Sequence, residues 1–120
     1  MHPEIEGIIR ESAREYLARE LMEKGLYAQA AESDVLSFDD IYFLGVCQAS
    51  ENIALDFICQ RDERRCPRDL IDDELRERMF LESSRLVARL YASTSEQMMK
   101  RWKDIQERFA CWIHSRCESR

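Results

Sequence analysis

The chain has 120 residues, of which 45% are hydrophobic and 35% are charged, with only three Gly and two Pro. This length suits one helical domain over residues 1–120, and the scarcity of turn-forming residues argues against a fold rich in hairpins. The net charge is −6, no run of 18 apolar residues occurs, and no basic stretch followed by an apolar one marks the start. We therefore expect a cytoplasmic protein with no membrane segment.

The negative charge is concentrated in the first half of the chain. Residues 1–60 carry 4 Lys or Arg and 12 Asp or Glu, a balance of −8, whereas residues 61–95 balance at zero and residues 96–120 at +2. Such a field repels phosphates and anionic membranes and attracts a basic partner. We accordingly expect no binding of nucleic acid or membranes.

Apolar residues at helical spacing predict a first helix from about Pro3 to Lys24, stopped by Gly25 in a left-handed conformation. Residues 26–33 form a short second helix or a bent continuation of the first. A capping box of Ser37 and Asp40 opens a long helix over about 38–60. The apolar residues of this helix point in every direction around its axis, which is typical of a buried central helix.

Pro67 breaks this helix, and another follows from about Leu70 to Ala92. Ser93 and Glu96 fit a second capping box, which opens a last helix over 95–117. Its apolar residues are spaced by four and three like a heptad seam, but over too few heptads for a free-standing coiled coil. The fold class predicted is all-α, a four- or five-helix bundle with the central helix (about 38–60) wrapped by the others.

Catalytic motifs are scarce. The sequence has no Gly-rich phosphate loop, no H-E-x-x-H and no G-x-S-x-G, and its only histidines are His2 and His114. We therefore predict a protein that is not an enzyme and that holds no cofactor.

The five cysteines are an odd number without a CxxC pair, which favours reduced thiols. Cys111, His114 and Cys117 are spaced three apart near the C-terminus, so His114 could share a metal ion with either cysteine. Residues six apart diverge by about 120° around a helix, however, so the two cysteines do not easily converge. We predict no metal site and keep a metal-binding sensor or enzyme that uses these residues as one alternative.

Two pairs of residues in the helices each have a structural and a functional interpretation. Glu51 and Asp56 are the only charged residues between Ile41 and Gln60, and they form either a water-facing strip or an acidic contact site. Trp102 and Trp112 belong either to the core or to an interface, which would be a homodimer through the 95–117 helix if that helix pairs with its copy.

The segment from Gly25 to Leu44 resembles the helix-turn-helix of TetR-type regulators, through Ala30-Ala31, Val35-x-Ser37 and Ile41-Tyr42. The resemblance implies a DNA-binding helix, with a larger helical part after it. The residues depart from that chemistry, because no Lys or Arg occurs between Gly25 and Gln60 and three aspartates stand where phosphate contacts would lie. The sequence is not assigned to the family, and a transcriptional regulator stays an alternative.

The preferred interpretation is a small acidic protein that binds a partner protein, as an inhibitor, an immunity factor, an antitoxin-like protein or an adaptor. Its N-terminal half would dock on a basic surface. The candidate partner-binding residues are Asp34, Asp39, Asp40, Glu51, Asp56, Trp102 and Trp112.

Overall fold

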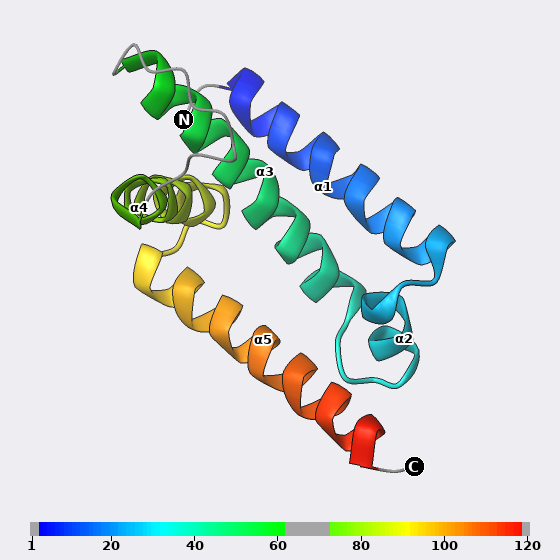
Figure 1. Ribbon diagram of the computed structural model, residues 1–120. Helices are drawn as coiled ribbons and strands as arrows, with labels where there is room; N and C mark the ends of the chain where they lie inside the picture. The colour runs from blue at the N-terminus through cyan, green and yellow to red at the C-terminus, as the bar shows by residue number, and fades with distance from the viewer. Residues whose placement is uncertain (1–2, 62–72, 119–120) are drawn as a thin grey trace.

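The computed structural model describes residues 3–61 and 73–118, with the side chains of Arg61, Cys117 and Glu118 left undescribed. Within these ranges the chain forms five helices and no strands (Figure 1), which confirms the all-α prediction. They are α1 (Pro3–Glu23), α2 (Leu26–Glu32), α3 (Phe38–Arg61), α4 (Asp73–Leu90) and α5 (Ser95–Glu118). None of the described helices is apolar enough over a sufficient length to cross a membrane.

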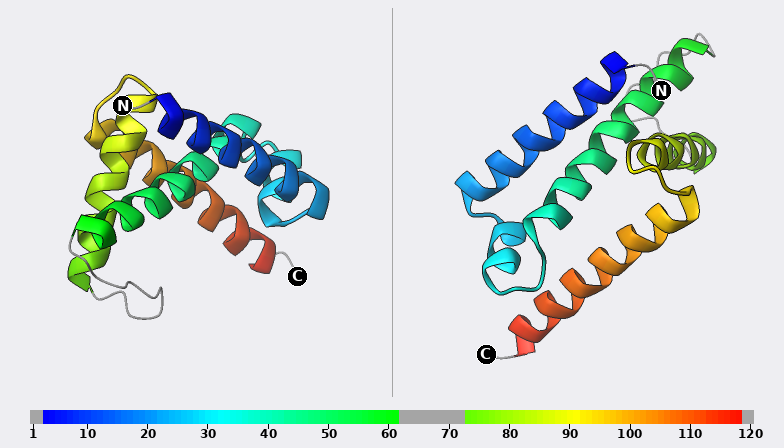
Figure 2. Two further views of the ribbon diagram at one scale, coloured as in Figure 1. Left: turned by 90° about the horizontal axis from the view of Figure 1, so that it is seen from above. Right: turned by 180° about the vertical axis from the view of Figure 1, so that it is seen from behind.

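The helices are arranged around α3. Helices α1 and α3 lie side by side and run in opposite directions, while α4 is seen end-on in Figure 1 and so runs across them. Helix α5 packs on α4 and on α2, and α2 lies at the end of the molecule where α1 gives way to α3 (Figures 1 and 2). Helix α3 is thus the central helix, as predicted.

Helix α3 is buried on most of its circumference, but not on all of it. Its fully or nearly fully buried apolar side chains include Ile41, Phe43, Leu44, Val46, Ala54, Leu55 and Ile58. Phe57 is 43% exposed, so the prediction of a helix with buried apolar residues all round is wrong at this position. The exposed polar residues Gln48, Asn52, Asp56 and Gln60 follow at spacings of four and leave one strip of α3 open.

Helices α1 and α3 approach each other closely at Gly45. A Cβ atom added to Gly45 would lie 3.1 Å from the Cα of Ala13 and 3.1 Å from the Cβ of Tyr16. The absence of a side chain at Gly45 therefore sets the distance between the two helices.

The helix ends differ from the prediction in two details. The left-handed residue after α1 is Lys24 (φ 51°), whereas Gly25 has φ −65° and caps α2, so the predicted stop at Gly25 is wrong by one residue. The cap of α5 is also one residue later than predicted, because the Thr94 hydroxyl accepts from the Gln97 N–H and the Gln97 side chain accepts from the Thr94 N–H. These are the two bonds of a capping box, with Thr94 and Gln97 in place of Ser93 and Glu96.

Candidate functional site

The three aspartates around the α2–α3 turn have different environments. Asp34 and Asp39 are exposed, and the structure describes no ion pair for either. Asp40 is buried and forms the predicted capping box, in which its carboxylate accepts from the Ser37 N–H at 3.0 Å and the Ser37 hydroxyl accepts from the Asp40 N–H at 3.1 Å. The Ser37–Asp40 prediction is confirmed.

Two arginines of α5 also reach Asp40. Arg108 lies 3.4 Å and Arg101 lies 3.7 Å from its carboxylate oxygens. Burial acts to raise the pKa of Asp40, but the Ser37 N–H, Arg108, the Ser37 hydroxyl and Arg101 together outweigh it and hold that pKa below its ordinary value. Asp40 therefore stabilises the fold and is not available to a partner, which corrects its assignment to the docking surface.

Arg101 and Arg108, which lie seven residues apart on one face of α5, were not among the residues predicted from the sequence. Arg108 also donates to the carbonyl of Val35 at 3.0 Å, and the guanidinium of Arg101 lies 4.4 Å from the ring centre of Phe43. Long side chains thus fill the space between α3 and α5. The seven-residue spacing was the available signal, since it places both arginines beside the apolar seam of α5.

Trp102 and Trp112 are half-buried against the chain's own core. Trp112 stacks on Phe109 with ring centres 5.9 Å apart, and Trp102 meets Phe80 edge-on at 6.4 Å. The apolar seam of α5 therefore packs against other helices of the same chain.

Glu51 and Trp102 come together in a small hollow between α3, α4 and α5. The hollow has a volume of about 30 Å³. Its lining includes Cys47 and Glu51 from α3, Ser83 and Ser84 from α4, and Met98 and Trp102 from α5. Burial raises the pKa of Glu51, which is half-buried.

Asp56 is exposed and lies about 140° further round α3 than Glu51, so these two carboxylates do not form one site.

Cys47 shares this hollow, and burial together with the nearby Glu51 charge raises the pKa of its thiol to about 12. Only the thiolate reacts with alkylating agents, so we expect iodoacetamide at pH 8 to modify Cys47 at least about a hundredfold more slowly than the exposed Cys111. Mass spectrometry of the digested protein measures both rates, and urea should bring them together. Equal rates in the folded protein would contradict the described burial.

Cys59 is disulfide-bonded, and the other half of that bond lies outside the described residues. The prediction that this cysteine is a reduced thiol is therefore wrong.

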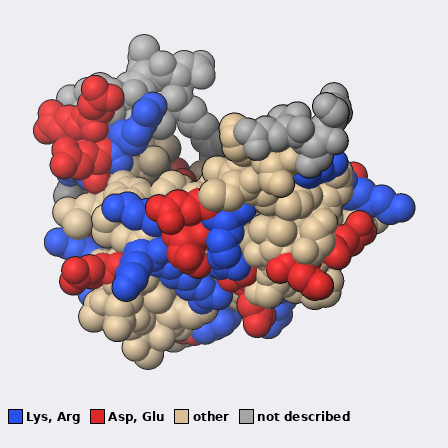
Figure 3. Space-filling model, turned by 90° about the horizontal axis from the view of Figure 1, so that it is seen from below, with Lys and Arg blue, Asp and Glu red and all other residues tan. Residues whose placement is uncertain are grey.

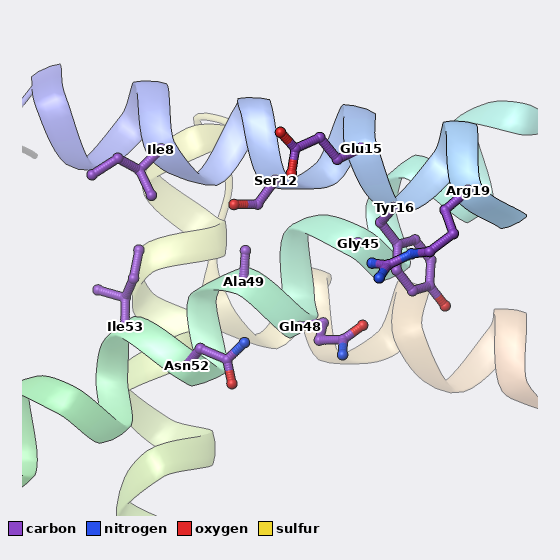
Figure 4. A pocket seen from close by; sticks show the side chains of 10 residues that line it. All are labelled: Ile8, Ser12, Glu15, Tyr16, Arg19, Gly45, Gln48, Ala49, Asn52 and Ile53. Carbon is purple, nitrogen blue, oxygen red and sulfur yellow. The ribbon is translucent and has the colours of Figure 1, made fainter.

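A groove with mixed polar and apolar walls lies between α1 and α3 and has a volume of about 280 Å³ (Figure 4). Ile8 of α1 and Ile53 of α3 face each other at one end, Tyr16 and Arg19 lie at the other, and Gln48 and Asn52 form the α3 rim. Ser12 and Glu15 add polar groups from α1. Ile8 is 54% exposed. The groove thus combines an accessible apolar end with hydrogen-bonding side chains, the mixture found in protein interfaces.

Charges of both signs are mixed on one face of the molecule. On the face seen in Figure 3, Lys and Arg lie among Asp and Glu, so that face is not uniformly acidic. Glu15 in the groove and Asp56 on the open strip of α3 are exposed, and neither forms an ion pair within the described structure. The exposed negative charge of the N-terminal half without an ion pair in the described structure includes these two carboxylates, Asp34 and Asp39, together with Glu11, Glu23 and Glu32.

The three residues of the alternative metal site are described only in part. Cys111 and His114 are exposed on α5, while the side chain of Cys117 lies outside the described residues. Among the side chains that are described, no group of three or more His, Cys, Asp or Glu could hold a metal ion.

The segment that resembles a helix-turn-helix forms α2, a turn and the start of α3. Ile41, Phe43 and Leu44 in this part of α3 are buried, so the start of α3 belongs to the core. Comparison with protein-family models, curated protein sequences and solved structures gave no match.

Proposed function

We propose that this protein binds a partner protein with a basic surface, and that the α1–α3 groove and the carboxylates beside it are the contact region. The observation that carries the proposal is the groove itself, in which exposed Ile8 lies together with Glu15 and the open polar strip of α3. A partner would cover the apolar end and hydrogen-bond to the polar rim.

Charge complementarity favours a basic partner. Glu15 and Asp56 are not paired within the described chain, and the first 60 residues carry a balance of −8. Lysines and arginines of a partner would neutralise this charge and be steered toward it during encounter. Arg19, at the far end of the groove, would form an ion pair with an acidic group of the partner and so fix the partner's orientation.

The predicted homodimer through residues 95–117 is not part of this proposal. Ile105 is fully buried, and Trp102 and Trp112 pack against the chain's own core. A second copy would have to displace those contacts. An inhibitor, an immunity factor, an antitoxin-like protein and an adaptor would all use the proposed contact. The cytoplasmic location expected from the sequence stays a prediction.

A capture experiment with two charge-matched variants tests the proposal. The groove variant, Glu15→Gln with Asp56→Asn, removes one charge in the groove and one on the open strip of α3, and Glu77→Gln with Glu107→Gln removes two exposed charges on α4 and α5. Extract from the native cell is passed over each immobilised protein at about 0.1 M and about 1 M salt, between which the Debye length falls from about 10 Å to about 3 Å.

We expect a basic protein to be retained at low salt by the wild type and by the α4/α5 variant, and to be retained at least about tenfold less by the groove variant. High salt should release it from every column. Equal retention by the two variants would show that the groove is not the contact region, and retention of no basic protein by the wild type would contradict the proposed function.

A further inference from the structure

The hollow between α3, α4 and α5 holds a carboxylate that has no partner among the residues that the structure describes. Glu51 lines it, is half-buried and makes no hydrogen bond or ion pair with any residue that the structure describes. A carboxylate among apolar side chains is stabilised when a cation joins it. Arg101, whose charge acts on the neighbouring Cys47 thiol, is engaged with Asp40, Phe43 and Tyr91.

The two serine hydroxyls of the hollow can only accept further hydrogen bonds. Ser83 donates its hydroxyl proton to the carbonyl of Phe80 at 3.0 Å, and Ser84 donates to the carbonyl of Leu81 at 2.8 Å. Each hydroxyl oxygen then keeps only acceptor capacity. Together with the Glu51 carboxylate, these two hydroxyls give the hollow a set of acceptors, and an ammonium group is a ligand that has three donors and no acceptor.

The walls also suit a cation on an apolar chain. Trp102 and Phe80 meet edge-on with ring centres 6.4 Å apart, and Met98 and Met99 complete that side. Aromatic faces attract ammonium groups, and methionine adapts its shape to a methylene chain. The volume of about 30 Å³ fits about two water-sized groups, since one requires roughly 10–15 Å³. A primary ammonium is of this size, whereas a guanidinium or trimethylammonium is larger.

We propose that this hollow binds a primary alkylammonium group, as found on a lysine side chain or a small free amine, with Glu51 as the counter-ion and Trp102 as the aromatic wall. The site is separate from the α1–α3 groove, because none of the residues lining the hollow lines the groove. The proposal therefore does not depend on the docking of a partner protein.

The test is a titration of the whole chain with two probes, followed by NMR of the Trp102 indole N–H and the Glu51 carboxyl carbon. One probe is Nα-acetyl-lysine N-methylamide, which represents a lysine in a peptide, and the other is butylamine. We expect saturable shifts of both signals, with a dissociation constant on the order of 1–10 mM for a ligand this small. Tighter binding of the lysine derivative would identify a peptide as the source, and tighter binding of butylamine would identify a free amine.

Two variants and one modified probe make the result specific. Glu51→Gln should weaken binding at least about tenfold, because it removes the counter-ion. Asp56→Asn makes the same charge change on the open strip of α3 and should leave the binding unchanged. The trimethylated lysine derivative, whose side-chain ammonium has no N–H to donate, should not shift the wild-type signals.

Three results would overturn the proposal. These are the absence of saturable shifts with both amines in the wild type, equal affinity in wild type and Glu51→Gln, and binding of the trimethylated probe as tight as that of lysine. The wild-type spectra decide the first and third of these, so the proposal stays testable even if Glu51→Gln does not fold.

Discussion

Replacing Phe43 by Ala should lower the free energy of unfolding by about 4 kcal/mol, the largest effect of a single substitution that we expect in this chain. Phe43 has no exposed surface and is the largest fully buried side chain. It meets Tyr91 edge-on with ring centres 5.5 Å apart and lies under the Arg101 guanidinium at 4.4 Å. Its removal leaves a cavity between α3 and α5 and takes away one wall against which Arg101 rests.

Phe57→Ala is the matched control, because Phe57 is on the same helix and is 43% exposed. We expect it to cost less than about 1.5 kcal/mol, since most of the area it would lose already faces water. Urea denaturation followed by circular dichroism measures both variants. A loss of stability at Phe57 equal to that at Phe43 would mean that the described core is not the one that holds the fold.

Asp40→Ala should lower the free energy of unfolding by about 3 kcal/mol. The substitution removes the side-chain half of the α3 cap, worth about 0.5–2 kcal/mol, and leaves Arg101 and Arg108 without their shared carboxylate. Asp39→Ala is the control, because Asp39 is the exposed neighbour and makes no ion pair in the described structure. We expect it to change stability by no more than about 0.5 kcal/mol.

The contribution of Asp40 should also depend on pH. Its pKa is lower in the folded state than the ordinary value of 3.8, so folding favours the charged form. The stabilisation is present above that ordinary value and is lost as the pH falls through the folded pKa. The stability difference between wild type and Asp40→Asn should therefore shrink as urea denaturation is repeated at decreasing pH below about 4. A difference that stayed constant to the lowest pH would exclude the ion pairs as its source.

The helices could be predicted from the sequence because their signals are local. Helical spacing and the Ser37–Asp40 capping box identified α3 within one residue of its observed end. The heptad spacing of α5 correctly marked its packed face. The errors at Gly25 and at the α5 cap come from neighbouring residues that satisfy the same rule, since Lys24 takes the left-handed conformation and Thr94 with Gln97 forms the box.

The candidate sites could not be predicted as fully, because they depend on contacts between distant residues. Asp40 and Arg108 are 68 positions apart, and nothing local distinguishes Asp40 from Asp39 as the one that arginines neutralise. Glu51 and Asp56 had two possible environments, because a helix with apolar residues on every side does not indicate which side stays open. The fold resolves this by placing α1 and α4 on α3 in a way that covers Glu51 in part and leaves Asp56 exposed.

Carboxylate footprinting tests the proposed contact region most directly. Exposed carboxylates are coupled to an amine by carbodiimide, once in the purified protein and once in native cell extract at about 0.1 M salt, where electrostatic contacts are only partly screened. We predict that the extract protects Glu15 and Asp56 several-fold, that Glu77 and Glu107 are labelled equally in both samples, and that about 1 M salt removes the protection. Labelling of Glu15 and Asp56 that is the same in extract and in the purified protein would contradict a basic partner at the α1–α3 groove.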